Sequence, residues 1–407
     1  MQHLIKTSLI SGLLLLSRIG VSQDLDVGRV IRFSEGQIGL LLEETRLLTS
    51  SDGRVSPRTL DADGRLHLVA PTDWTSGFFP GILWQLYAFT EADKWLDAAR
   101  EMTTKLENEK FNGRTHDMGF KIYCSYGQGY RLTEDPRYRD VIVQAARTLA
   151  TRFNPNVGCI RSWDHNSHRW DFPVIIDNML NLELLFAATK LTGDSSFYYI
   201  AVSHANTTLK NHFRPDGGSY HVIDYHPETG EVAHRNTHQG YSDESTWARG
   251  QAWALYGYTM CYRETKDEKY RHKALAIAQW LMRHPHMPAD GVPYWDFDAP
   301  KIPDEPRDAS AAAVIASGLY ELCTFTTDSL ALKQYADHVV HSLATHYKAD
   351  ADTHHGFVLL HSTGSKPAGS EVDVPLVYAD YYFLEALSRK QRLERSGDPS
   401  LALLLTR

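Results

Sequence analysis

The sequence is poor in cysteine and contains no long hydrophobic run. Its four cysteines are spread over the chain and form no CxxC pair, at Cys124, Cys159, Cys261 and Cys323. This spacing indicates neither a zinc site nor a dense disulfide scaffold, although single disulfides remain open. No stretch reaches the roughly 18 apolar residues that indicate a transmembrane helix. With 43% hydrophobic and 11% aromatic residues in a chain of 407, the composition instead predicts a large globular core.

Several signatures of other protein classes are also missing. The net charge is −8 and there is no basic block, which argues against nucleic acid as a partner. The chain has no glycine-rich phosphate loop, no GxSxG elbow and no HExxH motif. Its 20 histidines show no recognised ligand spacing, so we expect neither a catalytic metal nor another cofactor. A local arginine or histidine can still hold a small anionic ligand.

The first 23 residues have the pattern of a secretory signal peptide. Lys6 supplies the positive start, residues 9–16 form the apolar centre, and residues 21–23 offer a cleavage site. We therefore expect an exported protein, periplasmic or secreted, with no membrane contact once the signal is removed. Residues 24–388 are expected to form the folded domain and residues 389–407 a dispensable tail. The sequence leaves the oligomeric state open.

A short pattern, Thr-x-Asp-x-x-aromatic, recurs before helical stretches. It occurs at residues 133–138, 192–197 and 265–270, with weaker copies at 90–95 and 326–328. The aspartate is typical of a helix N-cap, and the aromatic residue is expected to pack against a neighbouring helix. The recurrence predicts a repeated pair of helices.

Two kinds of helical segment alternate along the chain. Amphipathic helices are expected to begin near Val27, Asp93, Asp135, Asp194, Asp267 and Asp328. Segments with apolar residues on more than one face start near Gly77, His116, Ile176, Arg249, Asp308 and Tyr378. Six buried helices inside six amphipathic ones describe an all-α (α/α)6 barrel, with a small β-hairpin insertion within residues 217–247. The loops before the buried helices should meet at one mouth of the barrel.

Two acidic residues stand where these loops lead into buried helices. Asp177 lies in the apolar segment VIIDNMLN at residues 174–181, and Asp117 lies in HDMGF at residues 116–120. Each could be a helix cap. If both face the mouth, they form the pair of carboxyl groups that glycoside chemistry uses. Burial and a like-charged neighbour raise a carboxyl pKa more than a helix N-terminus lowers it, so one of the pair should stay protonated near neutral pH.

Aromatic residues cluster in the same loops, at Trp74, Trp163, Trp247 and Trp253. Two of them flank Arg249 in STWARGQAW, residues 245–253. Flat rings beside an arginine suit a sugar with a carboxylate, which the guanidinium can hold with two hydrogen bonds. Any single tryptophan can equally belong to the core.

Six motifs occur in order between residues 73 and 383, namely DWTSGFFPG, HDMGF, IDNMLN, STWARGQAW, PRDASAAA and SEVDVPLVYADYYF. In these motifs the chain resembles the unsaturated glucuronyl hydrolases of glycoside hydrolase family 88, and the resemblance covers most of its length. It implies an (α/α)6 barrel that removes a 4,5-unsaturated uronic acid from the non-reducing end of oligosaccharides left by polysaccharide lyases.

The resemblance also implies roles for individual residues. Asp177 resembles the proton donor and water activator, and Asp117 its essential partner, acting as nucleophile or as assistant. The side chains implied to line the sugar site are His116, Trp74, Trp163, His221, Gln239, Trp247, Arg249 and Trp253, with Thr237, Ser370 and Asp373 as further contacts.

The implied chemistry needs one well-placed acid. The C4=C5 double bond of the substrate is an enol ether, and protonation of C4 gives an oxocarbenium ion at C5 that water attacks. The hemiketal that results opens and releases the neighbouring sugar. The expected partner is therefore an unsaturated uronic-acid oligosaccharide of glycosaminoglycan or ulvan type. Two alternatives stay open: an unsaturated rhamnogalacturonyl hydrolase acting on pectin fragments, and a sugar-binding barrel without catalysis.

Overall fold

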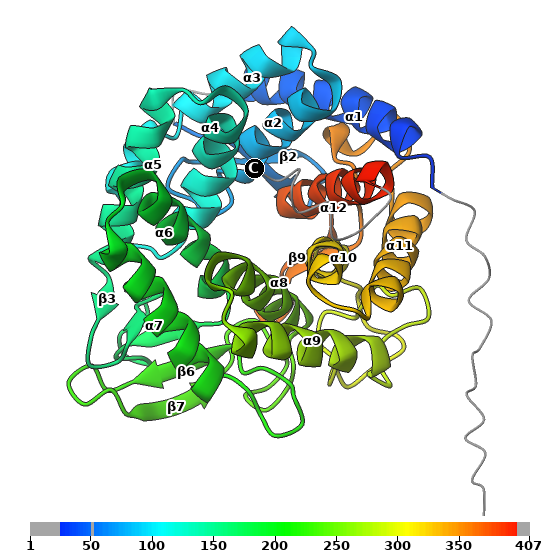
Figure 1. Cartoon of the computed structure of the whole chain (residues 1–407). Coiled ribbons are helices and arrows are strands. Elements are labelled where there is room, and N and C mark those ends of the chain that lie inside the picture. The colour runs from blue at the N-terminus through cyan, green and yellow to red at the C-terminus, as the bar shows by residue number, and fades with distance from the viewer. Residues whose placement is uncertain (1–24, 50–52, 397–407) are drawn as a thin grey trace, which may run out of the picture.

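The structure is a computed structural model that describes residues 25–49 and 53–396. The predicted signal peptide and residues 397–407 of the predicted tail lie outside the described residues. An inner ring of helices is surrounded by an outer ring (Figure 1). This arrangement is the (α/α)6 barrel expected from the sequence.

The outer ring is built from the amphipathic helices, and each begins within one residue of its predicted start. Asp135 caps its helix by accepting the N–H of Arg137 at 2.9 Å, and the following Tyr138 is buried. The weaker copies of the motif differ, because Asp93 lies inside the first turn and Asp328 makes no side-chain cap. The outer helices are α1 (Val27–Leu48), α3 (Asp93–Thr104), α5 (Pro136–Ala150), α7 (Ser195–Asn211), α9 (Glu268–Arg283) and α11 (Ser329–His346).

The inner helices are buried on most sides and begin within three residues of the predicted starts. They are α2 (Phe78–Thr90), the π-helix η2 (Gly119–Gly127) continued by α4 (Gln128–Thr133), α6 (Asn178–Thr192), α8 (Ala248–Thr265), α10 (Ala309–Leu322) and α12 (Val377–Ser396). Because each inner helix is followed by an outer one that returns, the inner helices all point the same way. Their N-terminal ends therefore gather at one mouth and their C-terminal ends at the other.

Short strands and turns fill the connections between the helices. The predicted hairpin is present as β6 (Val222–Tyr225) and β7 (Val232–Asn236), and β5 (Pro173–Ile175) extends it to three strands. The sequence did not predict β5 or three further hairpins, because strands of two to five residues show too little alternation. These are β1 (Ser56–Leu60) with β2 (Leu66–Val69), β3 (Phe153–Asn154) with β4 (Cys159–Ile160), and β8 (Ser362–Ser365) with β9 (Ser370–Val374); the 3-10 turns are η1 (Glu107–Phe111), η3 (Cys323–Phe325) and η4 (His354–Gly356).

The last inner helix continues past residue 388, the predicted end of the domain, as far as Ser396. Lys390 and Leu393 are buried, and Arg389 forms an ion pair with Glu321 at 2.9 Å. Residues 389–396 therefore belong to the inner ring rather than to a dispensable tail.

Three further features of the described residues concern membrane spans, cysteines and metal ligands. Within them, no helix has both the length and the apolar character needed to cross a membrane. The four cysteines all lie in this part of the chain and are buried free thiols. No group of three or more histidine, cysteine or acidic side chains in it is arranged to hold a metal ion.

Candidate active site

The N-terminal ends of the inner helices bring the two acids to the same mouth. Asp117 stands two residues before η2, and Asp177 occupies the N-cap position of α6. The two helices approach closely because Gly119 has no side chain, since a Cβ there would lie 2.6 Å from the Cα of Asn181. The N–H of Phe120 donates to Oδ1 of Asn181 at 3.0 Å. These contacts hold the helix starts that carry the acids side by side.

Neither carboxyl group acts as a helix cap. The side chain of Asp177 makes no capping hydrogen bond although the residue is at the N-cap. Asp117 accepts a hydrogen bond from the Thr115 hydroxyl at 2.7 Å, and its Oδ1 lies 3.2 Å from Nε2 of His116. Burial lowers the pKa of His116, although Asp117 opposes this effect. The capping role that the sequence left open is therefore excluded for both acids.

Asp177 is buried without a hydrogen bond to one of its oxygens. The residue is only 8% exposed, and its Oδ2 has no hydrogen-bond partner in the described chain. Burial raises the pKa of Asp177 to about 7; Arg249 opposes the rise, whereas the negative charge of Asp117 adds to it. One carboxyl of the pair thus keeps a proton near neutral pH, as the sequence predicted.

His221 turns one ring nitrogen toward Asp177. Its Nδ1 accepts the backbone N–H groups of His238 and Gln239, both at 3.1 Å, so the proton of the neutral ring is on Nε2. Nε2 lies 3.7 Å from Oδ2 of Asp177. Burial lowers the pKa of His221 well below its ordinary value, and the nearby His238 and Arg249 add to the effect. The ring therefore stays neutral and presents an N–H to the carboxyl group.

Arg249 is almost fully buried, and hydrogen bonds to neighbouring segments fix its side chain. Its Nη1 donates to Oδ2 of Asp308 at 2.7 Å and to the carbonyl of Thr363 at 2.5 Å, and its Nη2 donates to the carbonyl of Gly364 at 2.6 Å. Its Nε has no partner among the described residues. These bonds anchor the β8–β9 hairpin to α8 and α10. The contact of Arg249 with a substrate carboxylate stays a prediction.

The four tryptophans divide into two partly exposed rings and two buried ones. The side chain of Trp253 is fully buried and packs against Phe120 and Tyr382 at 5.3 Å each, and its contact with a sugar stays a prediction. Its place one and a half turns inside α8 puts it beneath the mouth. Trp247 is 3% exposed and lies 4.6 Å from the ring of His221. Both rings are thus held by packing, and the sugar contact of Trp247 also stays a prediction.

Trp74 and Trp163 keep exposed surface. The ring of Trp74 lies 5.0 Å from that of Tyr378 and marks one side of the mouth. Trp163 stacks on His165 at 5.0 Å and lies next to the ring of His238. These two are the predicted tryptophans that are available for stacking on a sugar.

The remaining predicted contacts lie in loops around the rim. Gln239 donates to the carbonyl of Gly364 at 3.0 Å and so joins two rim loops. The hydroxyl of Thr237 accepts the N–H of Gly240 at 2.7 Å and closes a turn. Ser370 and Asp373 are exposed on β9, and the latter contacts His361 at 2.7 Å. Within the described residues, no hydrogen bond or ion pair connects either of these two to the acids.

The sequence did not single out several residues that shape the site. Thr115 holds Asp117, and Asp308 holds Arg249 while also capping α10. At the rim, Arg58 joins Asp73 at 2.8 Å and Glu371 at 2.5 Å. The acidic partners of Arg58 and Arg249 lie in the motifs DWTSGFFPG, PRDASAAA and SEVDVPLVYADYYF. Their presence in these motifs was the only sequence signal that could have pointed to them.

Comparison with known proteins agrees with this geometry. Residues 54–391 match the family described as Glycosyl Hydrolase Family 88. An unsaturated glucuronyl hydrolase of Formosa agariphila is 53% identical over 340 residues, which cover 83% of this chain and 85% of that protein.

Solved structures share the fold over nearly the whole length. An unsaturated glucuronyl hydrolase specific for heparin has a TM-score of 0.85 and 44% identity, covering 91% of this chain and 98% of that one. A variant of the unsaturated glucuronyl hydrolase from Streptococcus agalactiae, complexed with dGlcA-GalNAc6S, has a TM-score of 0.75 and 28% identity, covering 90% of this chain and 92% of that one.

Proposed function

This chain belongs to glycosyl hydrolase family 88, and on that premise we propose that Asp177 is the proton donor with which it hydrolyses unsaturated glucuronyl oligosaccharides. The enzyme removes the 4,5-unsaturated glucuronic acid from the non-reducing end of glycosaminoglycan-type fragments. One observation carries the assignment of the donor. Asp177 is a buried carboxyl group with an unbonded oxygen and a pKa of about 7.

The first step is proton transfer to carbon. The protonated Asp177 gives its proton to C4 of the enol ether, which leaves a positive charge shared between C5 and the ring oxygen. The negative charge of Asp117, which already raises the pKa of Asp177, stabilises this cation. An acid with a pKa near the working pH suits this step, because it is both present in the protonated form and able to release the proton.

The second step is hydration. The Asp177 carboxylate takes a proton from water as the water oxygen bonds to C5, which restores the acid for the next turnover. The product is a hemiketal at C5, and its opening breaks the bond between C5 and the ring oxygen. C1 is then a hemiacetal, which collapses to an aldehyde and releases the neighbouring sugar as an alcohol. The N–H of His221, 3.7 Å from Oδ2, is placed to hold the carboxylate during this exchange.

The two alternatives differ from this function in measurable ways. A rhamnogalacturonyl hydrolase would prefer unsaturated disaccharides from pectin, whereas one similar solved structure is specific for heparin and another is responsible for the degradation of glycosaminoglycan. A barrel that only binds sugars needs no proton donor, so it does not require a buried carboxyl group that stays protonated at neutral pH.

The test is a panel of lyase-generated disaccharides from heparin, chondroitin, ulvan and pectin, with turnover followed as loss of the double-bond absorbance. Wild type should turn over at least one glucuronyl substrate, and Asp177→Asn should lose about 10²- to 10⁴-fold in kcat while still binding it. Glu101→Gln, an exposed carboxyl away from the mouth, is the matched control. Equal turnover by Asp177→Asn and wild type would refute the assignment.

We further propose that the enzyme is exported, to the periplasm or beyond. The support is the charged start, apolar centre and cleavage site of residues 1–23. Fractionation of cells that express the full chain, with N-terminal sequencing of the recovered protein, tests the proposal. Recovery in the cytoplasm with residues 1–23 intact would contradict it.

A further inference from the structure

A second cavity opens at the mouth opposite the two acids. Its volume is about 820 Å³, within the range of small-molecule sites. Residues near the C-terminal ends of the inner helices line it, for example Arg131 of α4 and Glu321 of α10, and its inner end reaches Phe120 and Leu180. The rings of Phe120, Trp253 and Tyr382 pack at 5.3 Å across the barrel between this cavity and the acids. Neither Asp117 nor Asp177 is among the residues that line the cavity.

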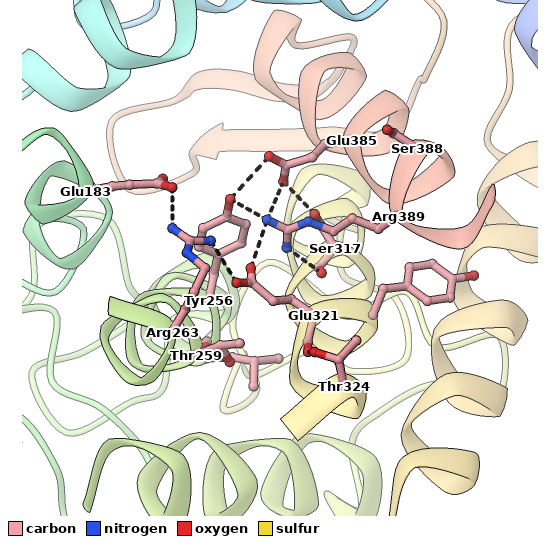
Figure 2. A network of polar contacts seen from close by, with 12 residues as sticks. Glu183, Tyr256, Thr259, Arg263, Ser317, Glu321, Thr324, Glu385, Ser388 and Arg389 are labelled. Atoms are coloured by element: carbon pink, nitrogen blue, oxygen red, sulfur yellow. Dashed lines mark hydrogen bonds and ion pairs between the residues drawn. The ribbon is translucent and has the colours of Figure 1, made fainter. Parts of the chain in front are cut away.

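Most charges in the wall of the cavity are already paired (Figure 2). Arg263 forms ion pairs with Glu183, with Glu264 at 2.9 Å and with Glu321 at 2.7 Å. Arg389 contacts the same Glu321 at 2.9 Å. These partly buried ion pairs give the wall a fixed shape, and the carboxylates of Glu183, Glu264 and Glu321 are all paired in them.

Two arginines of the lining are left without a carboxylate. Arg392 donates to the hydroxyl of Ser388 at 2.9 Å, and Arg131 donates to Oε1 of Gln128 at 2.8 Å. Neither forms an ion pair with any residue that the structure describes. Burial lowers the pKa of Arg392 to about 10, and the positive charges of Arg131 and Arg389 add to the effect. Glu385 and Glu321 lie near enough to oppose this effect, but each already forms an ion pair with Arg389, so Arg392 has no carboxylate of its own.

A buried amide in the same lining is also unpartnered. The side chain of Gln85 is 4% exposed, and neither its Oε1 nor its Nε2 has a hydrogen-bond partner within residues 25–49 and 53–396. A buried amide normally bonds both atoms. Here it supplies one donor and one acceptor that a hydroxyl group can satisfy.

The helix dipoles do not explain the surplus of arginines. The last carbonyls of the inner helices carry partial negative charge at this mouth. In α2, α4 and α8 one of these carbonyls is bonded by the backbone N–H group of the residue that follows the helix, at 2.8 Å in each case, namely Glu91, Glu134 and Lys266. The side chain of Arg392 lies on α12, whose end is one turn further on at Ser396.

We propose that this cavity is a second binding site, for a sugar-sized hydroxylated anion. Its acidic group pairs with Arg131 and Arg392, and its hydroxyl groups bond to Gln85. A uronate carboxylate and a sugar sulfate ester share this chemistry. The site is independent of hydrolysis at the first mouth.

The proposal is tested by isothermal titration calorimetry of the full chain with glucuronate, glucose 6-sulfate, glucose and inorganic sulfate. At least one acidic sugar should bind saturably and neutral glucose should not. Arg392→Gln and Arg131→Gln should each weaken that binding by about tenfold, the loss expected for one charge-assisted hydrogen bond. Arg395→Gln, an exposed arginine on the same helix, is the matched control and should bind as wild type does.

Comparing the two acidic sugars shows which anionic group the arginines bind. Tighter binding of glucuronate indicates a carboxylate, and tighter binding of glucose 6-sulfate indicates a sulfate ester. Turnover of an unsaturated disaccharide is measured in parallel and should be unchanged in all three variants, which shows that they fold. Arg131 is exposed, so its variant tests the proposal even if Arg392→Gln does not fold. The proposal is overturned by no saturable binding, by binding of inorganic sulfate alone, or by equal affinity in wild type and both cavity variants.

Discussion

Nε2 of His221 lies 3.7 Å from Oδ2 of Asp177, and neither atom has a hydrogen-bond partner in the described chain. The backbone adds a second tie, since the N–H of Ile176 donates to the carbonyl of His221 at 3.1 Å. The contact joins the start of β6 to the start of α6. It places a neutral N–H beside the one buried carboxyl group that the proposed reaction needs.

Replacing His221 by phenylalanine should lower kcat and move the alkaline limb of the pH–rate profile to higher pH. An N–H donor stabilises the ionised form of Asp177, so its loss raises the pKa of that group further. We expect a loss of about tenfold or more in kcat, as for one charge-assisted hydrogen bond. His221→Gln keeps a donor and should restore part of the rate. An unchanged alkaline limb in His221→Phe would show that the histidine is only structural.

The pH dependence of the wild-type rate follows from the proton on Asp177. Because burial raises its pKa to about 7, kcat/KM should fall above about pH 7 by up to tenfold per unit. The measurement is kcat/KM between pH 5 and pH 9 at constant ionic strength. A rate that rises through this range would mean that Asp177 acts first as a base.

The same carboxyl group should affect stability. Its pKa is raised on folding, so the folded state keeps a proton that the unfolded state loses near pH 4. The free energy of unfolding should therefore decline as pH rises from about 4 to about 7, by up to about 4 kcal/mol from this group, and level off above that. Asp177→Asn should lack this part of the decline. Urea titrations of both proteins at several pH values make the comparison, and parallel curves would contradict it.

The buried pair of Arg249 and Asp308 should be expensive to break. Both side chains are at most 1% exposed. Asp308→Asn leaves a buried guanidinium partly uncompensated, which should cost about 3–5 kcal/mol in urea denaturation. Glu101→Gln breaks the exposed pair with Arg46 and should cost less than about 1 kcal/mol. Similar losses in the free energy of unfolding for the two variants would mean that the buried pair stabilises the fold no more than the exposed one.

Trp74 and Trp253 should respond differently to truncation. Trp253→Ala removes a fully buried ring and should cost about 3–5 kcal/mol of stability. Trp74→Ala removes a partly exposed ring, so KM should rise while stability falls less. Thermal unfolding and steady-state kinetics of both variants separate the roles. A KM effect confined to Trp253→Ala would place the sugar deeper in the barrel than we infer.

Much of the fold was predictable because its signals are local. The cap at Asp135 and the buried ring of Tyr138 can be recognised within six residues, and the same pattern marks two other outer helices. The hairpins β1–β2 and β8–β9 escaped prediction, since their strands are short and their pairing depends on contacts with distant helices. The end of the domain was placed too early, at residue 388, because the partner of Arg389 is on α10 and so lies far away in the sequence.

The sequence by itself determined that buried and amphipathic helices alternate and that an acid stands at the start of two buried ones, because periodicity and helix starts depend on neighbouring residues. Only the tertiary structure decided which acid keeps its proton. That outcome depends on the burial of Asp177 and on the opposing charges of Asp117 and Arg249, which other helices bring to it. Likewise, the exposure that separates Trp74 from Trp253 exists only once the rings of helices have closed.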